Sequence, residues 1–276
     1  MRIRTLSSAW RRAGLVAAGL LVPAAASAQF AAPETRRPPV LGEQYHVEVS
    51  GNFWNPSMFG VISSEQFGQP GSDIDFDVDF GFERTRFKDL RFVIRPATKH
   101  RIRVQYTPVT YEAVSNFTRN ITFNGINFPL SLPVQSSFSW RVWRFGYEYD
   151  FVYKPWGFVG VLIETRMTEF DARLQSAIAS EFTTAKGPLP AIGVVARGYV
   201  HPTVALNFEF SGMRLPDIDP NYQADYWDWD LYGTVNFTNY VGFQLGWRKM
   251  STYLAIEKDS GDLAFQGLWF GAALRF

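Results

Sequence analysis

Apolar and polar residues alternate along most of the chain, in segments of about ten to fifteen residues. Between residues 226 and 237, alternate positions hold Trp227, Trp229 and Leu231, while the positions between them hold Asp228 and Asp230. A spacing of two is the period of a β-strand, whose successive side chains point to opposite faces. Each segment therefore predicts a strand with one apolar face and one polar face.

The whole chain contains ten such segments, joined by connections that alternate in length. The predicted strands cover roughly 43–54, 84–95, 99–113, 134–150, 156–170, 189–201, 202–214, 225–238, 241–256 and 262–276. Short turns fall at 96–98, 151–155, 201–202 and 238–240, and long loops at 55–83, 114–133, 171–188, 215–224 and 257–261. Membrane-spanning barrels have short turns at one end and long loops at the other. The pattern predicts an all-β fold, an antiparallel up-and-down transmembrane barrel of about ten strands, with eight or twelve as alternatives.

Aromatic residues distinguish this barrel from a soluble β-sandwich. They make up 17% of the chain and gather near the predicted strand ends. A sandwich points its apolar side chains inward, whereas a membrane barrel points them outward and places aromatic belts at the lipid headgroups. We expect two belts: Tyr149, Tyr153, Trp156, Phe237 and Tyr240 near the short turns, and Trp54, Trp140, Trp227, Trp229 and Tyr253 near the long loops.

The first 28 residues follow a different pattern, with four arginines, an apolar stretch at 13–22 and the small residues Ala26, Ser27 and Ala28. This order is typical of a secretory signal peptide cleaved before Gln29. The apolar stretch is too short for a spanning helix, which needs about 20 residues. We expect a signal peptide at 1–28, a periplasmic segment at 29–42 and the barrel at 43–276.

Charge and composition exclude several classes of function. Cleavage would remove four arginines and no acidic residue, so the net charge would change from +1 to −3, which gives nucleic acid no basic excess to bind. The absence of cysteine excludes disulfides, thiol chemistry and a lipoprotein anchor. We expect no cofactor.

The last predicted strand has apolar residues at every second position, including Leu268, Phe270 and Leu274, and the sequence stops at Phe276. This stretch resembles the C-terminal assembly signal of bacterial outer-membrane β-barrel proteins, and the layout of the chain is similar to the small barrels of that superfamily. The resemblance implies a protein of the Gram-negative envelope, located in the outer membrane. It also implies contact with the barrel assembly machinery during biogenesis, and with outer-membrane lipid and lipopolysaccharide afterwards. The sequence does not indicate an oligomeric state.

If the apolar faces contact lipid, many charged side chains face the lumen. They carry both signs and can pair across a narrow barrel, where an unpaired buried charge would cost several kcal/mol. The alternatives are a lumen filled by ion pairs and a narrow, porin-like path for small solutes. The expected lumen residues are His46, Glu48, Arg91, Arg95, Arg101, Arg103, Arg144, Glu148, Glu164, Arg166, Arg197, Asn207, Glu209, Asp228, Asp230, Gln244 and Arg248.

The first long loop contains Asp73, Asp75, Asp77 and Asp79 at alternate positions. In an extended segment these four carboxylates share one face, and oxygen ligands of this kind suit a hard divalent cation such as calcium. The spacing does not fit an EF-hand. The alternative is a solvated hairpin arm, so no metal site is assigned.

The function predicted from these patterns is a non-enzymatic outer-membrane barrel, either structural or a conduit for small solutes. The chain has three histidines: His46 near the periplasmic start of the first predicted strand, and His100 and His201 at short turns. It lacks the common serine-hydrolase, P-loop and zinc-protease motifs. Two alternatives remain: an outer-leaflet lipid or peptide hydrolase, and a surface binding module that uses the acidic first loop.

Overall fold

The computed structural model describes residues 39–64, 72–75, 79, 85–116, 120–123, 126–128, 133–176, 180–214, 222–256 and 259–276. The expected signal peptide at 1–28 and most of the segment at 29–42 lie outside these residues. In the described part of the chain, no helix is long and apolar enough to cross a membrane.

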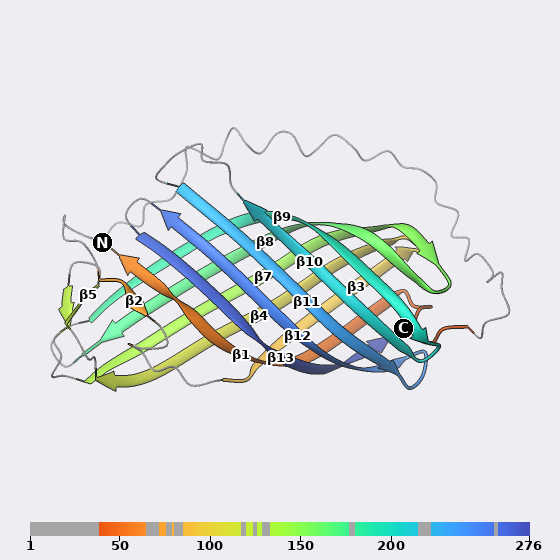
Figure 1. The fold of residues 1–276 in the computed structure, drawn as a ribbon, viewed down its shortest axis with the longest axis horizontal. Coiled ribbons are helices and arrows are strands. Elements are labelled where there is room, and N and C mark those ends of the chain that lie inside the picture. Colours follow the sequence, from red (N-terminus) through yellow and green to blue (C-terminus); the bar gives the residue numbers. More distant parts are fainter. Residues whose placement is uncertain are drawn as a thin grey trace. The chain divides into compact units, whose positions relative to one another are not determined.

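The described residues form a closed antiparallel β-barrel of ten strands, as the sequence pattern predicts (Figure 1). Each strand pairs with its neighbours along the chain, and β13 pairs with β1 to close the sheet. The barrel strands are β1 (Val47–Ser64), β3 (Phe87–Ala97), β4 (His100–Asn116), β7 (Pro133–Lys154), β8 (Gly157–Gln175), β9 (Ser180–His201), β10 (Val204–Arg214), β11 (Tyr222–Asn236), β12 (Val241–Ile256) and β13 (Asp259–Arg275).

The closing seam between β1 and β13 is as long as any other strand pair near it. Its register runs from Glu48 opposite Arg275 to Ser64 opposite Asp259. Closure gives the backbone groups of the first and last strands hydrogen-bond partners, so the barrel has no open edge.

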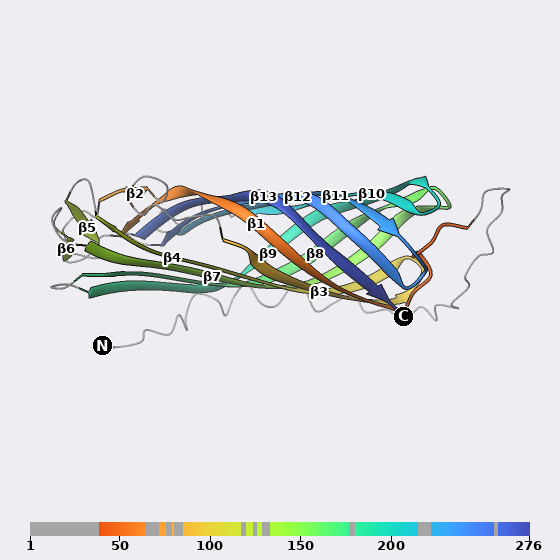
Figure 2. The same cartoon turned by 90° about the horizontal axis from the view of Figure 1, so that it is seen from below.

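Three short strands lie at the long-loop end of the barrel, opposite the end that holds the C-terminus (Figures 1 and 2). Strand β2 (Ile74–Asp75) pairs with β1, and β5 (Ile121–Phe123) pairs with β6 (Ile126–Phe128) in a separate hairpin. Their apolar side chains, including Ile74 and Phe123, are buried. These strands therefore cover this end of the barrel interior.

The expected ends of several strands are wrong. The sequence pattern predicts loops at 171–188 and 257–261, but β8 and β9 stay paired up to Gln175 opposite Ser180, and β12 and β13 up to Ile256 opposite Asp259. Strand β1 begins at Val47 and continues to Ser64. The extensions of β8 and β9 lack an apolar outer face, for example at Arg173 and Lys186, which is why the alternation does not reveal them.

The polarity of the two faces reverses along the barrel. Near the short turns the outer wall is mainly apolar and the interior is charged. Near the long loops the interior is mainly apolar and the outer wall is mainly polar. On β12 the outer face changes from Trp247 to Lys249 and the inner face from Arg248 to Met250. On β13 the outer face changes from Leu268 to Gln266. We call this level the polarity boundary.

The reversal explains two errors in the expected aromatic belts. Trp54 and Trp140 are buried in the interior, at 1% and 0% exposure, because they lie on inward-facing positions just beyond the polarity boundary. Tyr153 also turns inward, where its hydroxyl donates to Glu43. The other expected belt residues are exposed on the outer wall: Tyr149, Trp156, Trp227, Trp229, Phe237, Tyr240 and Tyr253.

Candidate functional site

Charged side chains fill the lumen between the short turns and the polarity boundary. Among the described residues, nine arginines and nine carboxylates form ion pairs there, so their formal charges cancel. All the cations are arginines, whose planar guanidinium can bind two carboxylates at once. The residues are Arg91, Arg95, Arg101, Arg103, Arg144, Arg166, Arg197, Arg248 and Arg275, with Glu43, Glu48, Asp89, Glu148, Asp150, Glu164, Glu209, Asp228 and Asp230.

Residues 41–45, the N-terminal plug, enter the short-turn end of the lumen before β1 begins. Leu41 N–H donates to Pro202 O at 2.8 Å, and the Asn236 side-chain amide donates to Leu41 O at 2.8 Å. Gly42 has a φ of 76°, and a Cβ there would lie 2.6 Å from Arg275 Nη1. The plug thus needs glycine at this position for both conformation and space.

Glu43 is the central acceptor of the plug. Its carboxylate lies 3.1 Å from Arg95, 3.2 Å from Arg101 and 3.4 Å from Arg197, and it accepts hydrogen bonds from Tyr153 and Tyr199. Burial alone would raise the pKa of Glu43, but the three arginines and the Tyr199 hydroxyl outweigh it and lower that pKa from 4.5 to about 2. The ionised Glu43 carboxylate therefore connects β3, β4 and β9 through their arginines.

A second group of ion pairs lies deeper in the lumen and is shared between distant strands. Glu209 Oε1 on β10 accepts from Arg91 on β3 at 2.9 Å and from Arg103 on β4 at 2.7 Å. Arg103 also lies 3.1 Å from Glu148 on β7, which Arg101 contacts at 2.6 Å. These pairs cross the barrel and occupy its centre.

The third group lies on the short-turn side of the polarity boundary, next to it, and is centred on Asp228 of β11. Its carboxylate lies 2.9 Å from Arg144, 2.8 Å from Arg248 and 3.5 Å from Arg166. Arg144 also contacts Glu164 at 3.0 Å. One carboxylate thus compensates arginines from three strands.

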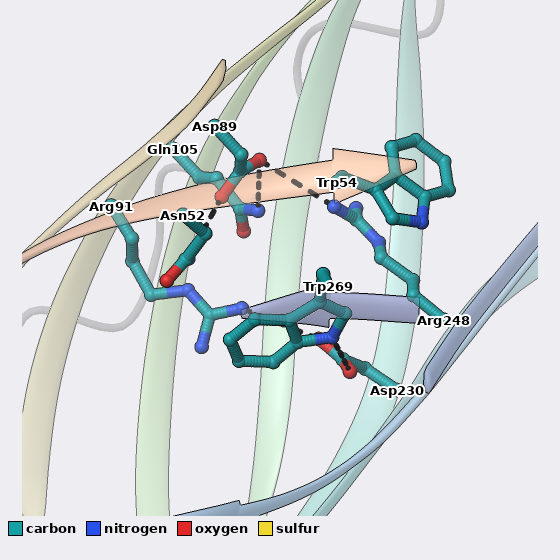
Figure 3. A pocket seen from close by; sticks show the side chains of 8 residues that line it. All are labelled: Asn52, Trp54, Asp89, Arg91, Gln105, Asp230, Arg248 and Trp269. Carbon is teal, nitrogen blue, oxygen red and sulfur yellow. Dashed lines mark hydrogen bonds and ion pairs between the residues drawn. The ribbon is translucent and has the colours of Figure 1, made fainter. Parts of the chain in front are cut away.

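Asp89 and Asp230 accept hydrogen bonds from neighbouring side chains close to the Asp228 group (Figure 3). Asp89 accepts from Gln105 at 2.8 Å and from Asn52 at 3.3 Å, and Trp269 Nε1 donates to Asp230 at 2.8 Å. The cavity between these side chains has a volume of about 10 Å³, and a second one beside Arg103 about 20 Å³. Each has room for about one water molecule.

Aromatic side chains fill the interior beyond the polarity boundary. Phe265 packs against Trp140 and Phe138, with ring centroids 4.9 and 6.2 Å away. Phe87 and Tyr111 make an edge contact at 5.1 Å. The buried apolar side chains of this part form one packed cluster, as in the core of a soluble barrel.

The structure places the predicted lumen residues as follows. Each of the twelve charged residues Glu48, Arg91, Arg103, Arg144, Glu148, Glu164, Arg166, Arg197, Glu209, Asp228, Asp230 and Arg248 takes part in the ion pairs above, and Arg95, Arg101, Asn207 and Gln244 also lie inward. His46 was expected in the lumen and is exposed, because β1 starts only at Val47 and the preceding residues do not continue its alternation.

Sequence reasoning missed four of the paired residues: Glu43, Asp89, Asp150 and Arg275. Strand parity could have identified Asp89 and Asp150, which are two residues from Arg91 and Glu148. It could also have identified Arg275, which alternates with Leu274 and Phe276. Glu43 lies outside any strand, so no periodic signal marks it.

The acidic loop is only partly described. Asp75 N–H donates to Asp79 Oδ2 at 2.9 Å, Asp79 is buried and Asp73 is exposed, while Asp77 lies outside the described residues. No group of three His, Cys, Asp or Glu side chains among the described residues is placed to hold a metal ion. The cation site stays a prediction.

The three histidines lie at the short-turn end. His100 Nδ1 lies 2.5 Å from the Tyr147 hydroxyl, and His201 Nδ1 lies 2.8 Å from the Thr203 hydroxyl.

The expected assembly signal at the C-terminus lies at the same end of the barrel. Leu274 and Phe276 are exposed on the outer wall, and Phe270 lies further along the same face with its ring 5.6 Å from that of Phe53. The role of these three in assembly stays a prediction.

No protein-family model matches the sequence, and no curated protein matches it. Among solved structures, the outer membrane protease OmpT from Escherichia coli is 9% identical with a TM-score of 0.55, over 84% of this chain and 97% of that chain. The attachment invasion locus protein Ail of Yersinia pestis is 9% identical with a TM-score of 0.36, over 84% and 99%. A Pseudomonas aeruginosa FadL homologue is 6% identical with a TM-score of 0.36, over 83% and 90%. The similarity to OmpT concerns the fold alone: the chain has the fold of bacterial outer-membrane β-barrels, with no specific member matched.

Proposed function

We propose that this chain, which has the fold of outer-membrane β-barrels, is an integral outer-membrane protein with a lumen closed to solutes and a structural, non-enzymatic role. The observation that carries the proposal is the filling of the interior from end to end. Three groups of ion pairs and the N-terminal plug occupy the polar half, and aromatic residues occupy the other half.

The outer wall supports the membrane location. On the short-turn side of the polarity boundary, the wall consists of apolar side chains such as Leu90, Ile163, Leu231 and Leu268. Each of these four is about 60% exposed. A continuous apolar band of this kind is unfavourable in water and is the lipid-contacting surface of a membrane barrel. In this orientation the short turns face the periplasm.

The ion pairs support closure. A solute crossing the lumen would have to separate pairs such as Arg103–Glu209 and Arg144–Asp228, and an unpaired buried charge costs about 3–5 kcal/mol. It would then meet the aromatic residues around Phe265, which offer no hydrogen bonds to replace its hydration shell. Both halves therefore favour a closed barrel over a conduit.

A hydrolase active at the outer surface has less support. Histidine is the most frequent general base, and the three histidines lie at the opposite end of the barrel from the long loops. The fold shared with OmpT does not imply a shared activity, since one fold carries many functions.

Conductance in planar lipid bilayers tests the proposal. The refolded protein, with insertion verified by heat-modifiable migration on gels, should give no stable single-channel steps in concentrated potassium chloride. A variant lacking residues 39–45 should also be silent, because the Asp228 group and the aromatic residues remain. Stable, reproducible steps from the wild type would overturn the closed lumen and restore the conduit.

A further inference from the structure

The side chains that bind the Glu43 carboxylate belong to the barrel wall and not to the plug. Arg95 lies on β3, Arg101 on β4 and Arg197 on β9. Among the described residues, Glu43 is the only carboxylate that forms an ion pair with Arg95 or Arg197, whereas Arg101 pairs with two further carboxylates. Departure of the plug would therefore leave two buried arginines unpaired, which is strongly unfavourable unless another anion replaces Glu43.

We propose that these side chains form a binding site for an acidic peptide segment at the periplasmic mouth of the barrel, and that the N-terminal plug occupies this site as a tethered ligand. The three arginines bind the carboxylate together with the hydroxyls of Tyr153 and Tyr199, which both donate to Glu43. A periplasmic protein that presents such a segment takes the place of the plug. This inference rests on the orientation proposed above, in which the short turns face the periplasm, but not on closure of the lumen.

The backbone contacts of the plug favour a peptide over a free anion. The N–H and the carbonyl of Leu41 each form a hydrogen bond of 2.8 Å, with Pro202 O and with the Asn236 side chain. The Glu43 carbonyl accepts from Arg95. A carboxylate or phosphate ion has no backbone and could not make these three hydrogen bonds together. The site therefore recognises main-chain groups as well as negative charge.

The plug also defines which residues flank the acidic one. The position before it requires glycine, because Gly42 has a φ of 76° and a Cβ there would lie 2.6 Å from Arg275 Nη1. Two positions after it, the buried Tyr45 ring has the guanidinium carbons of Arg95 and Arg275 at 5.5 and 5.8 Å from its centroid. Gln44 between them is exposed. The expected ligand thus carries glycine, glutamate, any residue and an aromatic residue, in that order.

Fluorescence anisotropy with a labelled peptide tests this site on the full chain in uncharged detergent micelles. The probe has the sequence of residues 40–46, VLGEQYH. The double variant Gly42→Pro with Glu43→Gln vacates the site, because proline cannot adopt the positive φ of Gly42 and the second change removes the tethered carboxylate. This vacated variant should bind the probe at least about tenfold more tightly than the wild type, whose own plug competes at a high effective concentration.

Matched probes and variants check which groups are recognised. A probe with glutamine in place of its glutamate, and one with valine in place of its glycine, should each bind the vacated variant about tenfold more weakly or worse. Adding Arg197→Gln to the vacated variant should weaken binding of the original probe by a similar factor. Adding Arg214→Gln, which removes an exposed cation of the outer wall, should leave binding unchanged. Heat-modifiable migration verifies that each variant folds.

Equal binding of the glutamate and glutamine probes would overturn the proposal. So would equal binding by the wild type and the vacated variant, or no binding by the vacated variant. Displacement of the probe by inorganic phosphate at the concentration of the probe would also overturn it, because the site would then bind an anion without the peptide. None of these outcomes bears on conductance, so failure here is distinguishable from failure of the closed lumen.

The variant Glu43→Ala carries the test if the vacated variant does not fold. It keeps the plug backbone and removes only the carboxylate, so concentrated acetate should raise its thermal unfolding midpoint by binding the folded state. The wild type, whose site is filled, should show no such rise, and potassium chloride at equal ionic strength is the control for screening. An equal shift in both proteins, or none in the variant, would overturn the carboxylate site.

Discussion

Within the part of the chain that the structure describes, arginine is the only cation in the ion pairs of the lumen, and its geometry explains why. The Arg144 guanidinium contacts Glu164 and Asp228 with different nitrogens, at 3.0 and 2.9 Å. A lysine ammonium is a single point of charge with a flexible stem and could not hold two carboxylates in fixed directions. In a narrow lumen, this double contact lets equal numbers of acids and bases pair across several strands.

Asp228→Asn tests how strongly the lumen depends on these pairs. The substitution leaves Arg144, Arg166 and Arg248 without their shared carboxylate, so the free energy of unfolding should fall by about 3 kcal/mol or more. The measurement is denaturant unfolding in lipid vesicles, followed by tryptophan fluorescence. Asp225→Asn, on the same strand but on the outer wall, should change stability by only about 0.5 kcal/mol. Similar losses for both would contradict a structural role for the lumen pairs.

At the scale of the element, a long barrel strand has two sections. On one side of the polarity boundary its outer face is apolar, and on the other side its inner face is apolar. Strand β7 illustrates this: the outer face runs from Trp143 to Arg141, while the inner face runs from Arg144 to Trp140. The alternation of period two persists through the reversal, so the hydrogen-bond register continues without interruption. Only the environment of each face changes.

This reversal separates what could be predicted from what could not. The number of strands and the orientation of residues such as Asp228 follow from alternation alone. The strand ends and the inward Trp54 and Trp140 do not, because an aromatic residue on a strand fits both a lipid-facing belt and an interior core. Pairings such as Arg103 with Glu209 depend on strand order and closure, which join residues far apart in the sequence.

The N-terminal plug was not predictable because its residues have no periodic pattern; it is defined only by its contacts in the folded barrel.

The stabilising role of the Glu43 carboxylate can be tested by changing the pH. Its pKa is about 2 in the folded protein against 4.5 normally, so its stabilising contribution is complete above pH 4.5 and is lost as the pH falls toward 2. The difference corresponds to about 3 kcal/mol. Unfolding free energies of the wild type and Glu43→Gln should therefore converge by about this amount between pH 4.5 and 2. A constant difference across that window would show that Glu43 is not held ionised by its arginines.

At the scale of the whole molecule, the barrel consists of two sections with opposite solvent preferences. The section near the short turns is apolar outside and charged inside, as suits lipid, and the section near the long loops is polar outside and aromatic inside, as suits water. Their junction, the polarity boundary, lies at the level of the outer-wall ion pair of Arg141 and Glu169. If the proposed membrane location is correct, the sequence of the outer faces sets the depth at which the barrel sits in the bilayer.

Site-directed spin labelling along the outer face of β12 tests this claim most directly, and the absence of native cysteine makes single labels straightforward. Labels introduced by Phe243→Cys, Leu245→Cys and Trp247→Cys should be accessible to oxygen and protected from a water-soluble nickel complex in bilayers. Labels introduced by Lys249→Cys, Ser251→Cys and Tyr253→Cys should show the reverse, with the change between 247 and 249. Accessibility to the nickel complex at all six positions would contradict the membrane-embedded outer wall, and protection through Tyr253→Cys would contradict the assigned boundary.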